Sequence, residues 1–126
     1  PLNNFVSRLS MSNPLITGVW KGKAFTTSDK SYGHGYNLFE KNGETQRKVK
    51  MRTQISISKF DKNPSFVLDY TAYNSFLGKV NTVDEIRKLD SNLSLGVGAW
   101  GFTTTQRLKP FPFCLLGALR PFVGSD

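Results

Sequence analysis

The chain has 126 residues, a formal net charge of +8, sixteen aromatic residues and one cysteine. This length suits one domain with a sizeable core, and the many aromatic residues favour strands over a helix bundle. A single cysteine excludes an internal disulfide, and without a signal peptide or an apolar run of roughly twenty residues we expect a cytoplasmic protein with no transmembrane segment.

The first predicted element is a short helix over residues 3–11, where Phe5 and Leu9 share one helical face. Asn13-Pro14 ends this helix, because the residue before a proline is pushed out of the α region. We therefore expect residues 1–13 to form an N-terminal helix or lid over one end of a single domain that spans residues 1–126.

The next segment, "NPLITGVWKGKAF", places Trp20 between Gly18 and Gly22 in a β-prone run. Tryptophan needs a large packing surface, whereas glycine has no side chain to pack and weakens the interior of a strand. The combination is typical of a strand that bends sharply in a closed, strongly curved sheet. We expect Trp20 to plug one end of such a barrel and to have a structural role, with a catalytic indole as the alternative.

Strands are predicted along the rest of the chain, with turn residues between them. Asn42-Gly43 is a strong hairpin signal, and Gly96, Gly98 and Gly101 mark bends or bulges. The predicted strands span residues 16–26, 35–41, 47–60, 65–74, 79–89, 93–107 and 112–119. Such regularly spaced strands predict an all-β fold, a single antiparallel meander barrel.

Much of the positive charge lies in one predicted strand, "KVKMRTQISIS". Val49, Met51, Thr53, Ile55 and Ile57 alternate there with basic and polar residues. This period of two predicts a half-buried strand whose lysines and arginines form its solvated face. The alternatives are a nucleic-acid surface or an anionic membrane surface, but no stacking motif of the single-strand binders is present, so we expect no specific nucleic acid.

The strands at 65–74 and 79–89 contain the candidate catalytic residues. In "SFVLDYTAYN" the face that bears Phe66 and Leu68 is apolar apart from the hydroxyl of Tyr70. In "KVNTVDEIRKL" one face carries Val80, Thr82, Asp84 and Ile86. If that face points inward, Asp84 is a carboxylate in an apolar cavity and, with Tyr70 nearby, a candidate acid or base. In the alternative, Asp84 faces water or pairs with Arg87 or Lys88.

Further residues are expected to form the wall of an enclosed ligand site. Trp100 is either a second plug or part of this wall, and the hydroxyls of Tyr36 and Thr53 either bind a ligand or are satisfied within the core. The predicted ligand-binding residues are Tyr36, Met51, Thr53, Phe66, Leu68, Trp100 and Phe113. One histidine and one cysteine do not furnish a usual metal-ligand set, and no Gly-rich phosphate loop opens a helix, so we expect no metal and no cofactor.

Three short segments carry a resemblance to known proteins. "GVWKGKAF" resembles the first-strand Gly-x-Trp pattern of the lipocalin-like (calycin) barrels, and "GVWKG" matches the Gly-x-Trp-x-Gly pattern of a family of small proteins of unassigned function. "NTVDEIRKLDSNLSLG" and "PFPFCLLGA" are similar to later segments of that family. The resemblance implies a lipocalin-like barrel in which Gly18 and Gly22 let the first strand bend and Arg120 packs over Trp20.

The expected function is to enclose a small, mostly apolar organic molecule, because small barrels leave room for one ligand. In one hypothesis, the protein is a cofactor-independent enzyme that promotes cyclisation or isomerisation of a polyketide- or terpenoid-like intermediate. The alternative is a non-catalytic carrier or sensor of a hydrophobic ligand, and a nucleic-acid-binding barrel is a third. A homodimer is compatible with all of these.

Overall fold

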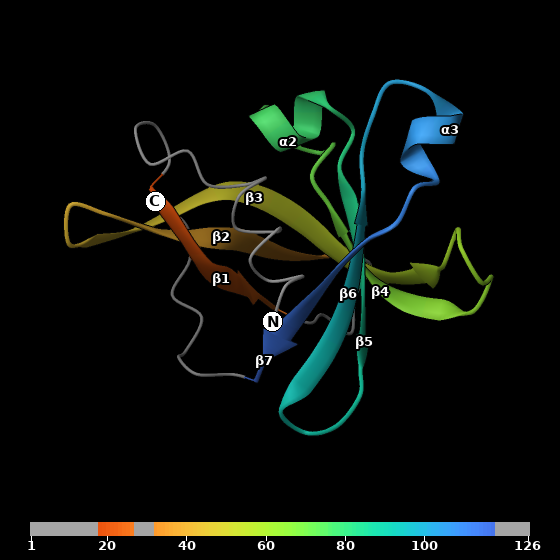
Figure 1. Cartoon of the computed structure of the whole chain (residues 1–126), viewed down its shortest axis with the longest axis horizontal. Helices are drawn as coiled ribbons and strands as arrows, with labels where there is room; N and C mark the ends of the chain where they lie inside the picture. Colours follow the sequence, from red (N-terminus) through yellow and green to blue (C-terminus); the bar gives the residue numbers. More distant parts are fainter. Residues whose placement is uncertain (1–17, 27–31, 118–126) are drawn as a thin grey trace.

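The computed structural model describes residues 18–26 and 32–117, which form a nearly closed antiparallel barrel (Figure 1). Its seven strands follow one another in the sheet in chain order, so the predicted all-β meander is confirmed. The strands are β1 (Val19–Phe25), β2 (Gly33–Lys41), β3 (Glu44–Ile57), β4 (Pro64–Asp69), β5 (Val83–Lys88), β6 (Leu93–Ala99) and β7 (Phe111–Leu116). The predicted helix over residues 3–11 lies outside the described residues.

Two short helices are present where the sequence predicted none. Helix α2 (Phe76–Lys79) precedes β5, and helix α3 (Thr104–Arg107) lies between β6 and β7. The hydroxyl of Ser75 accepts a hydrogen bond from the Gly78 amide and caps α2. Thr103 and Gln106 form a reciprocal capping box around α3. The predicted strand 93–107 is therefore too long, because the capping box stabilises a helical turn at its end. Helix α2 lies in the gap between predicted strands 65–74 and 79–89, which are also too long, since β4 ends at Asp69 and β5 begins at Val83.

A bulge in β1 determines which of its side chains enter the barrel. Trp20 pairs with Phe39 and Gly22 pairs with Leu38, so Lys21 is an extra residue in the ladder. An extra residue reverses the alternation of faces beyond it. Trp20 and the Lys23 side chain are consequently both buried although they are three residues apart, and Lys21 is exposed.

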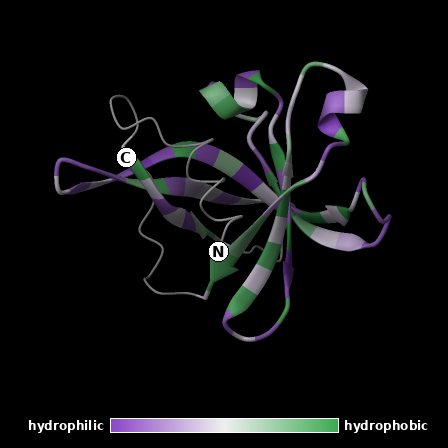
Figure 2. Ribbon diagram, viewed as in Figure 1, coloured by the Kyte–Doolittle hydropathy of each residue, from purple (hydrophilic) through white to green (hydrophobic). Residues whose placement is uncertain are grey.

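The apolar core lies between β3, β4, β5 and β7. Its central cluster consists of Met51, Leu68, Tyr70, Ile86 and Phe113. Hydrophobic and hydrophilic residues alternate along the strands, as Figure 2 shows for the long β3.

The buried face predicted for β3 ends earlier than expected. Met51 and Thr53 are buried, but Ile55 and Ile57 are 70% and 60% exposed. The ladder with β2 ends at Thr53, so the last part of β3 pairs with β4 alone and extends beyond the barrel. The prediction that Ile55 and Ile57 belong to a buried face is therefore wrong.

Gly18 and Gly43 share a left-handed backbone conformation but differ in their surroundings, so substituting each one shows how closely the start of β1 packs against β2. Gly18 and Gly43 share a φ of 78°, but a Cβ on Gly18 would lie 2.4 Å from the carbonyl oxygen of Glu40, whereas nothing lies within 4 Å of one on Gly43. We expect Gly43→Ala to lower the free energy of unfolding by about 1 kcal/mol through its backbone conformation. Gly18→Ala should cost a further ~1–3 kcal/mol from the clash. Equal losses in urea unfolding would contradict the close approach.

Candidate functional site

A cavity of about 240 Å³ lies inside the barrel beneath α2. Most of its wall is aromatic or aliphatic, and the charged or hydroxyl-bearing side chains in the wall are those of Lys23, Thr82 and Asp84. The lining residues are Trp20, Lys23, Phe76, Leu77, Val80, Thr82, Asp84, Gly98, Ala99, Trp100, Phe111 and Phe113. An apolar cavity with a few convergent polar groups is the usual form of a small-molecule site.

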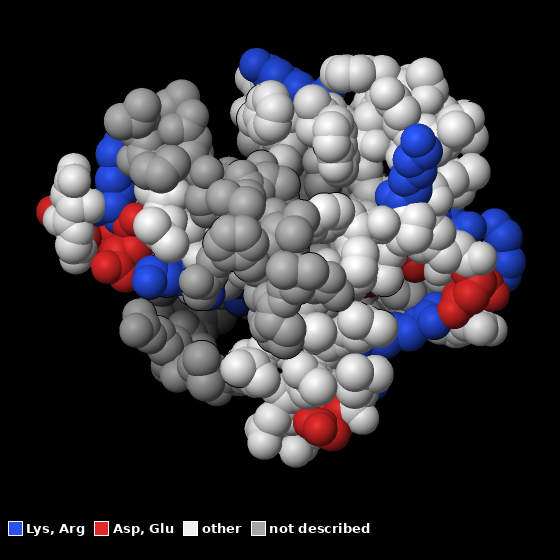
Figure 3. Space-filling view, in the orientation of Figure 1, with Lys and Arg blue, Asp and Glu red and all other residues white. Residues whose placement is uncertain are grey.

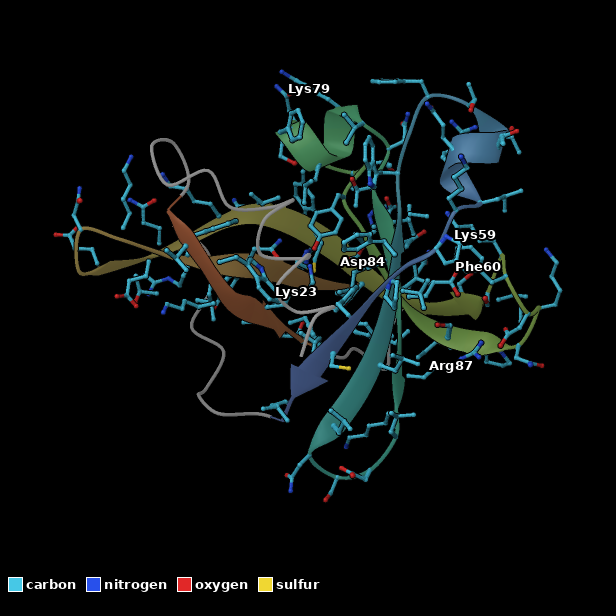
Figure 4. All side chains as sticks on the ribbon, in the orientation of Figure 1. Lys23, Lys59, Phe60, Lys79, Asp84 and Arg87 are labelled. Atoms are coloured by element: carbon cyan, nitrogen blue, oxygen red, sulfur yellow. The ribbon has the colours of Figure 1, made fainter. Side chains whose placement is uncertain are left out.

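The polar end of the cavity is a buried ion pair between β1 and β5. Lys23 Nζ lies 3.0 Å from Asp84 Oδ2, and the two side chains are only 2% and 7% exposed. Figure 4 shows the two residues close together at the centre of the barrel. Because charges are rarely buried without a partner, each of these side chains requires the other.

The Lys23 ammonium has three N–H groups, and the structure provides three acceptors. They are Asp84 Oδ2, the Tyr70 hydroxyl oxygen and, at 3.1 Å, Asn37 Oδ1. The same ammonium lies 5.1 Å from the centre of the Tyr70 ring and 5.4 Å from that of Phe113, within cation–π range. The donor capacity of Lys23 is therefore fully used within the protein.

A second set of hydrogen bonds holds these acceptors in place. The Tyr70 hydroxyl donates to Asp84 Oδ2 at 3.3 Å, and Trp20 Nε1 donates to Asn37 Oδ1 at 3.0 Å. Asn37 Nδ2 lies 3.2 Å from both the Val49 carbonyl oxygen and the Tyr70 hydroxyl oxygen. The indole of Trp20 thus anchors the amide that in turn orients Lys23.

The network keeps its protons at neutral pH. Burial by itself would lower the pKa of Lys23, but the charge of Asp84 and the oxygen of Tyr70 outweigh burial and raise this pKa to about 12. Burial raises the pKa of Tyr70 to about 12, although the nearby ammonium opposes this shift. Lys23 is therefore an ammonium rather than a nucleophilic amine, and Tyr70 is a neutral phenol.

Asp84 points into the barrel, on the same face as Thr82 and Ile86. It pairs with Lys23 and Tyr70 rather than with Arg87 or Lys88. Arg87, which is labelled in Figure 4, instead forms an exposed double contact with Asp61, one arm of which measures 2.6 Å. That contact holds the turn between β3 and β4 against β5.

The other predicted site residues divide between the cavity and the core. Trp20, Trp100 and Phe113 line the cavity, and Tyr70 touches both charged residues of its wall. The structure places five predicted ligand-binding residues elsewhere, buried or packed in the interior but outside the cavity lining: Tyr36, Met51, Thr53, Phe66 and Leu68.

The structural residues of the prediction lie at the start of the sheet. Gly18 lies against Glu40, and Gly22 follows the extra residue of the β1 bulge. Arg120 lies outside the described residues.

Sequence reasoning missed Lys23, Asn37 and Thr82 as site residues. Strict alternation puts Lys23 on the opposite face from Trp20, and only the bulge brings both inward. The signal was Gly22, because a glycine inside a strand often marks a bulge. Thr82 Oγ1 is buried, has no hydrogen-bond partner among the residues that the structure describes, and belongs to a residue that lines the cavity.

No family model, curated protein or solved structure matches the chain. Membership in the Gly-x-Trp-x-Gly family therefore stays a prediction. Within residues 18–26 and 32–117 no helix is long and apolar enough to cross a membrane, and no three metal-ligating side chains cluster.

The ion pair generates a stability prediction. Asp84→Asn leaves the Lys23 ammonium buried without a counter-charge, so we expect the free energy of unfolding to fall by ~3–5 kcal/mol. The double variant Lys23→Met with Asp84→Asn removes both charges and should recover at least half of that loss. Denaturant unfolding of the wild type, the Lys23→Met and Asp84→Asn single variants and the double variant measures the coupling between the two side chains. Additive losses from the two single substitutions would contradict a direct pair.

Proposed function

We propose that the barrel binds a small, mostly apolar organic molecule that carries one hydrogen-bond donor, such as a hydroxyl group. The proposal rests on the few polar side chains in an otherwise apolar cavity wall. Lys23 already has three acceptors, whereas Asp84 and Thr82 both line the cavity, and the buried Thr82 Oγ1 has no hydrogen-bond partner among the described residues. We expect a ligand hydroxyl to hydrogen-bond to the oxygens of these two side chains.

The cavity volume limits the size of the ligand. A cavity of about 150 Å³ accommodates benzene. The 240 Å³ available here suits one substituted ring or a short branched chain. Phe111, Phe113 and Trp100 offer flat surfaces against which such a ring would pack.

The charges also favour one class of polar group over another. A ligand carboxylate would approach Asp84 while finding no unused N–H on Lys23, so it would be repelled and left without a donor. An alcohol avoids both costs. The proposed ligand is therefore an alcohol-bearing molecule rather than an acid such as a fatty acid.

Cyclohexanol tests this preference directly, with cyclohexanecarboxylate as the matched acid. We expect saturable binding of cyclohexanol by NMR shift titration and at least 10-fold weaker binding of the acid.

Thr82→Val keeps the shape of the side chain and removes the hydroxyl, so it should weaken cyclohexanol binding by about one hydrogen bond, ~0.5–1.5 kcal/mol. Because Thr82 Oγ1 has no partner within the described chain, the same variant should not lower the free energy of unfolding. Equal binding of acid and alcohol would overturn the assignment.

A second candidate function is cofactor-independent isomerisation or cyclisation, as expected for a polyketide- or terpenoid-like substrate. The position of Asp84 favours it, because a carboxylate in an apolar wall is placed to accept a proton from bound substrate. Lys23 and Tyr70 retain their own protons, so Asp84 is the group that would move one.

Cyclohex-3-en-1-one is a suitable probe of this activity, because removal of a proton beside its carbonyl and return to the far alkene carbon gives the conjugated ketone. If Asp84 is catalytic, the protein should isomerise this probe, which ultraviolet absorbance of the conjugated product would monitor. The rate should fall ~10²–10⁴-fold in the Lys23→Met, Asp84→Asn double variant. Lys23→Met alone controls for loss of the ion pair. No rate above that of buffer, with cyclohexanol still bound, would leave binding as the function.

A further inference from the structure

Two exposed aromatic side chains lie at the opening of the cavity. Phe76 and Trp100 line the cavity yet are 74% and 57% exposed, so they lie at its rim. Phe102 and Leu108, in the connection between β6 and β7 that begins at Trp100, are 70% and 49% exposed. Several exposed large apolar side chains next to an apolar cavity suggest an interaction surface.

The two segments that carry these side chains are joined to each other. The Gly101 amide donates to the Val80 carbonyl oxygen at 2.7 Å, and Asn81 Nδ2 donates to the Gly101 carbonyl oxygen at 3.1 Å. Gln106 Oε1 accepts from the amides of Phe102 and Thr103. In Figure 1, α2 and α3 lie at the same end of the barrel. The aromatic residues therefore belong to one surface held by hydrogen bonds.

This surface carries positive charge and no negative charge of its own. Lys79 in α2 and Arg107 and Lys109 around α3 contribute cations, and residues 76–82 and 99–111 contain no aspartate or glutamate. Figure 3 shows blue and white atoms, without red, at the end that bears α2. We call the following set the mouth surface: Phe76, Lys79, Trp100, Phe102, Arg107, Leu108 and Lys109.

We infer that the mouth surface docks on the headgroup region of an anionic lipid bilayer, with the cavity opening turned toward the lipid. Aromatic side chains partition into the interfacial region, and lysines and arginines attract acidic headgroups. Both kinds of group surround the opening of an apolar cavity here. Docking in this orientation would let an apolar molecule pass between bilayer and cavity without crossing water.

Vesicle co-sedimentation of the whole protein tests this inference. The vesicles are phosphatidylcholine alone or with about 30% phosphatidylserine, each at about 0.1 M and 0.5 M salt. We expect binding to the acidic vesicles only, weakened at high salt. Phe102→Ser with Leu108→Ser should reduce the partition coefficient about 10-fold or more, although neither residue lines the cavity. Ile55→Ser with Ile57→Ser is the matched control, because these exposed side chains lie on β3.

A second pair of double variants distinguishes the charge of the mouth surface from the overall basic charge of the protein. Lys79→Glu with Lys109→Glu should lower the partition coefficient at least 10-fold. Lys48→Glu with Lys50→Glu changes the net charge equally on exposed positions of β3 and should have a smaller effect. Thermal unfolding of all variants confirms that they fold.

Three results would overturn the inference. In one, both charge pairs lose binding equally, which indicates diffuse attraction to a basic protein. In another, the vesicles fail to bind while the Phe102, Leu108 variant abolishes a concentration-dependent dimer, which assigns this surface to a second copy of the chain. In the third, duplex RNA binds and competes at physiological salt while vesicles do not. Each is distinguishable from loss of cyclohexanol binding, which reports on the cavity alone.

Discussion

The interaction on which the rest of the structure depends is the buried contact between the Lys23 ammonium and the Asp84 carboxylate. Within the described residues β1 and β7 form no backbone ladder, so the barrel is not closed by hydrogen bonds between its edge strands. Lys23 connects β1 to β5 through Asp84, to the end of β4 through Tyr70 and to β2 through Asn37. The ammonium also lies over the ring of Phe113 on β7. One charge thus connects strands from both edges of the sheet.

The same contact determines the chemistry of the cavity. A buried lysine with unused N–H groups would attract anions, but here all three are satisfied by the protein. Among the described residues, the other charged or hydroxyl-bearing side chains that line the cavity are Asp84 and Thr82, so we expect the cavity to suit a ligand that brings its own hydrogen-bond donor. Gly98 belongs to this arrangement, because a Cβ there would lie 2.7 Å from Asp84 Oδ1 and displace the carboxylate. Because the three N–H groups of Lys23 are all used within the protein, the apolar cavity has hydrogen-bond acceptors at its polar end.

The sequence predicted the strands well because their signals are local. Alternation in β3 and the Asn42-Gly43 turn identify that strand and its hairpin with β2 without any tertiary information. Helix α3 was missed because its capping residue Thr103 lies inside a segment that was predicted as a strand. Helix α2 lies between two predicted strands and has only four residues.

The centre of the site was harder to predict from the sequence. The inward face of Asp84 was one of two open alternatives, and its partner lies 61 positions earlier on a strand whose alternation is broken by a bulge. No short-range pattern contains that pairing, which arises only when the sheet curls.

The most direct test of this account is a titration of Lys23 by NMR of its side-chain nitrogen. We expect an ammonium resonance that exchanges slowly with water and persists until the pH nears about 12, well above the ordinary lysine value of 10.5. A Lys23 ammonium that exchanges rapidly with water and deprotonates at or below the ordinary lysine value of 10.5 would contradict the buried pair and the cavity chemistry built on it.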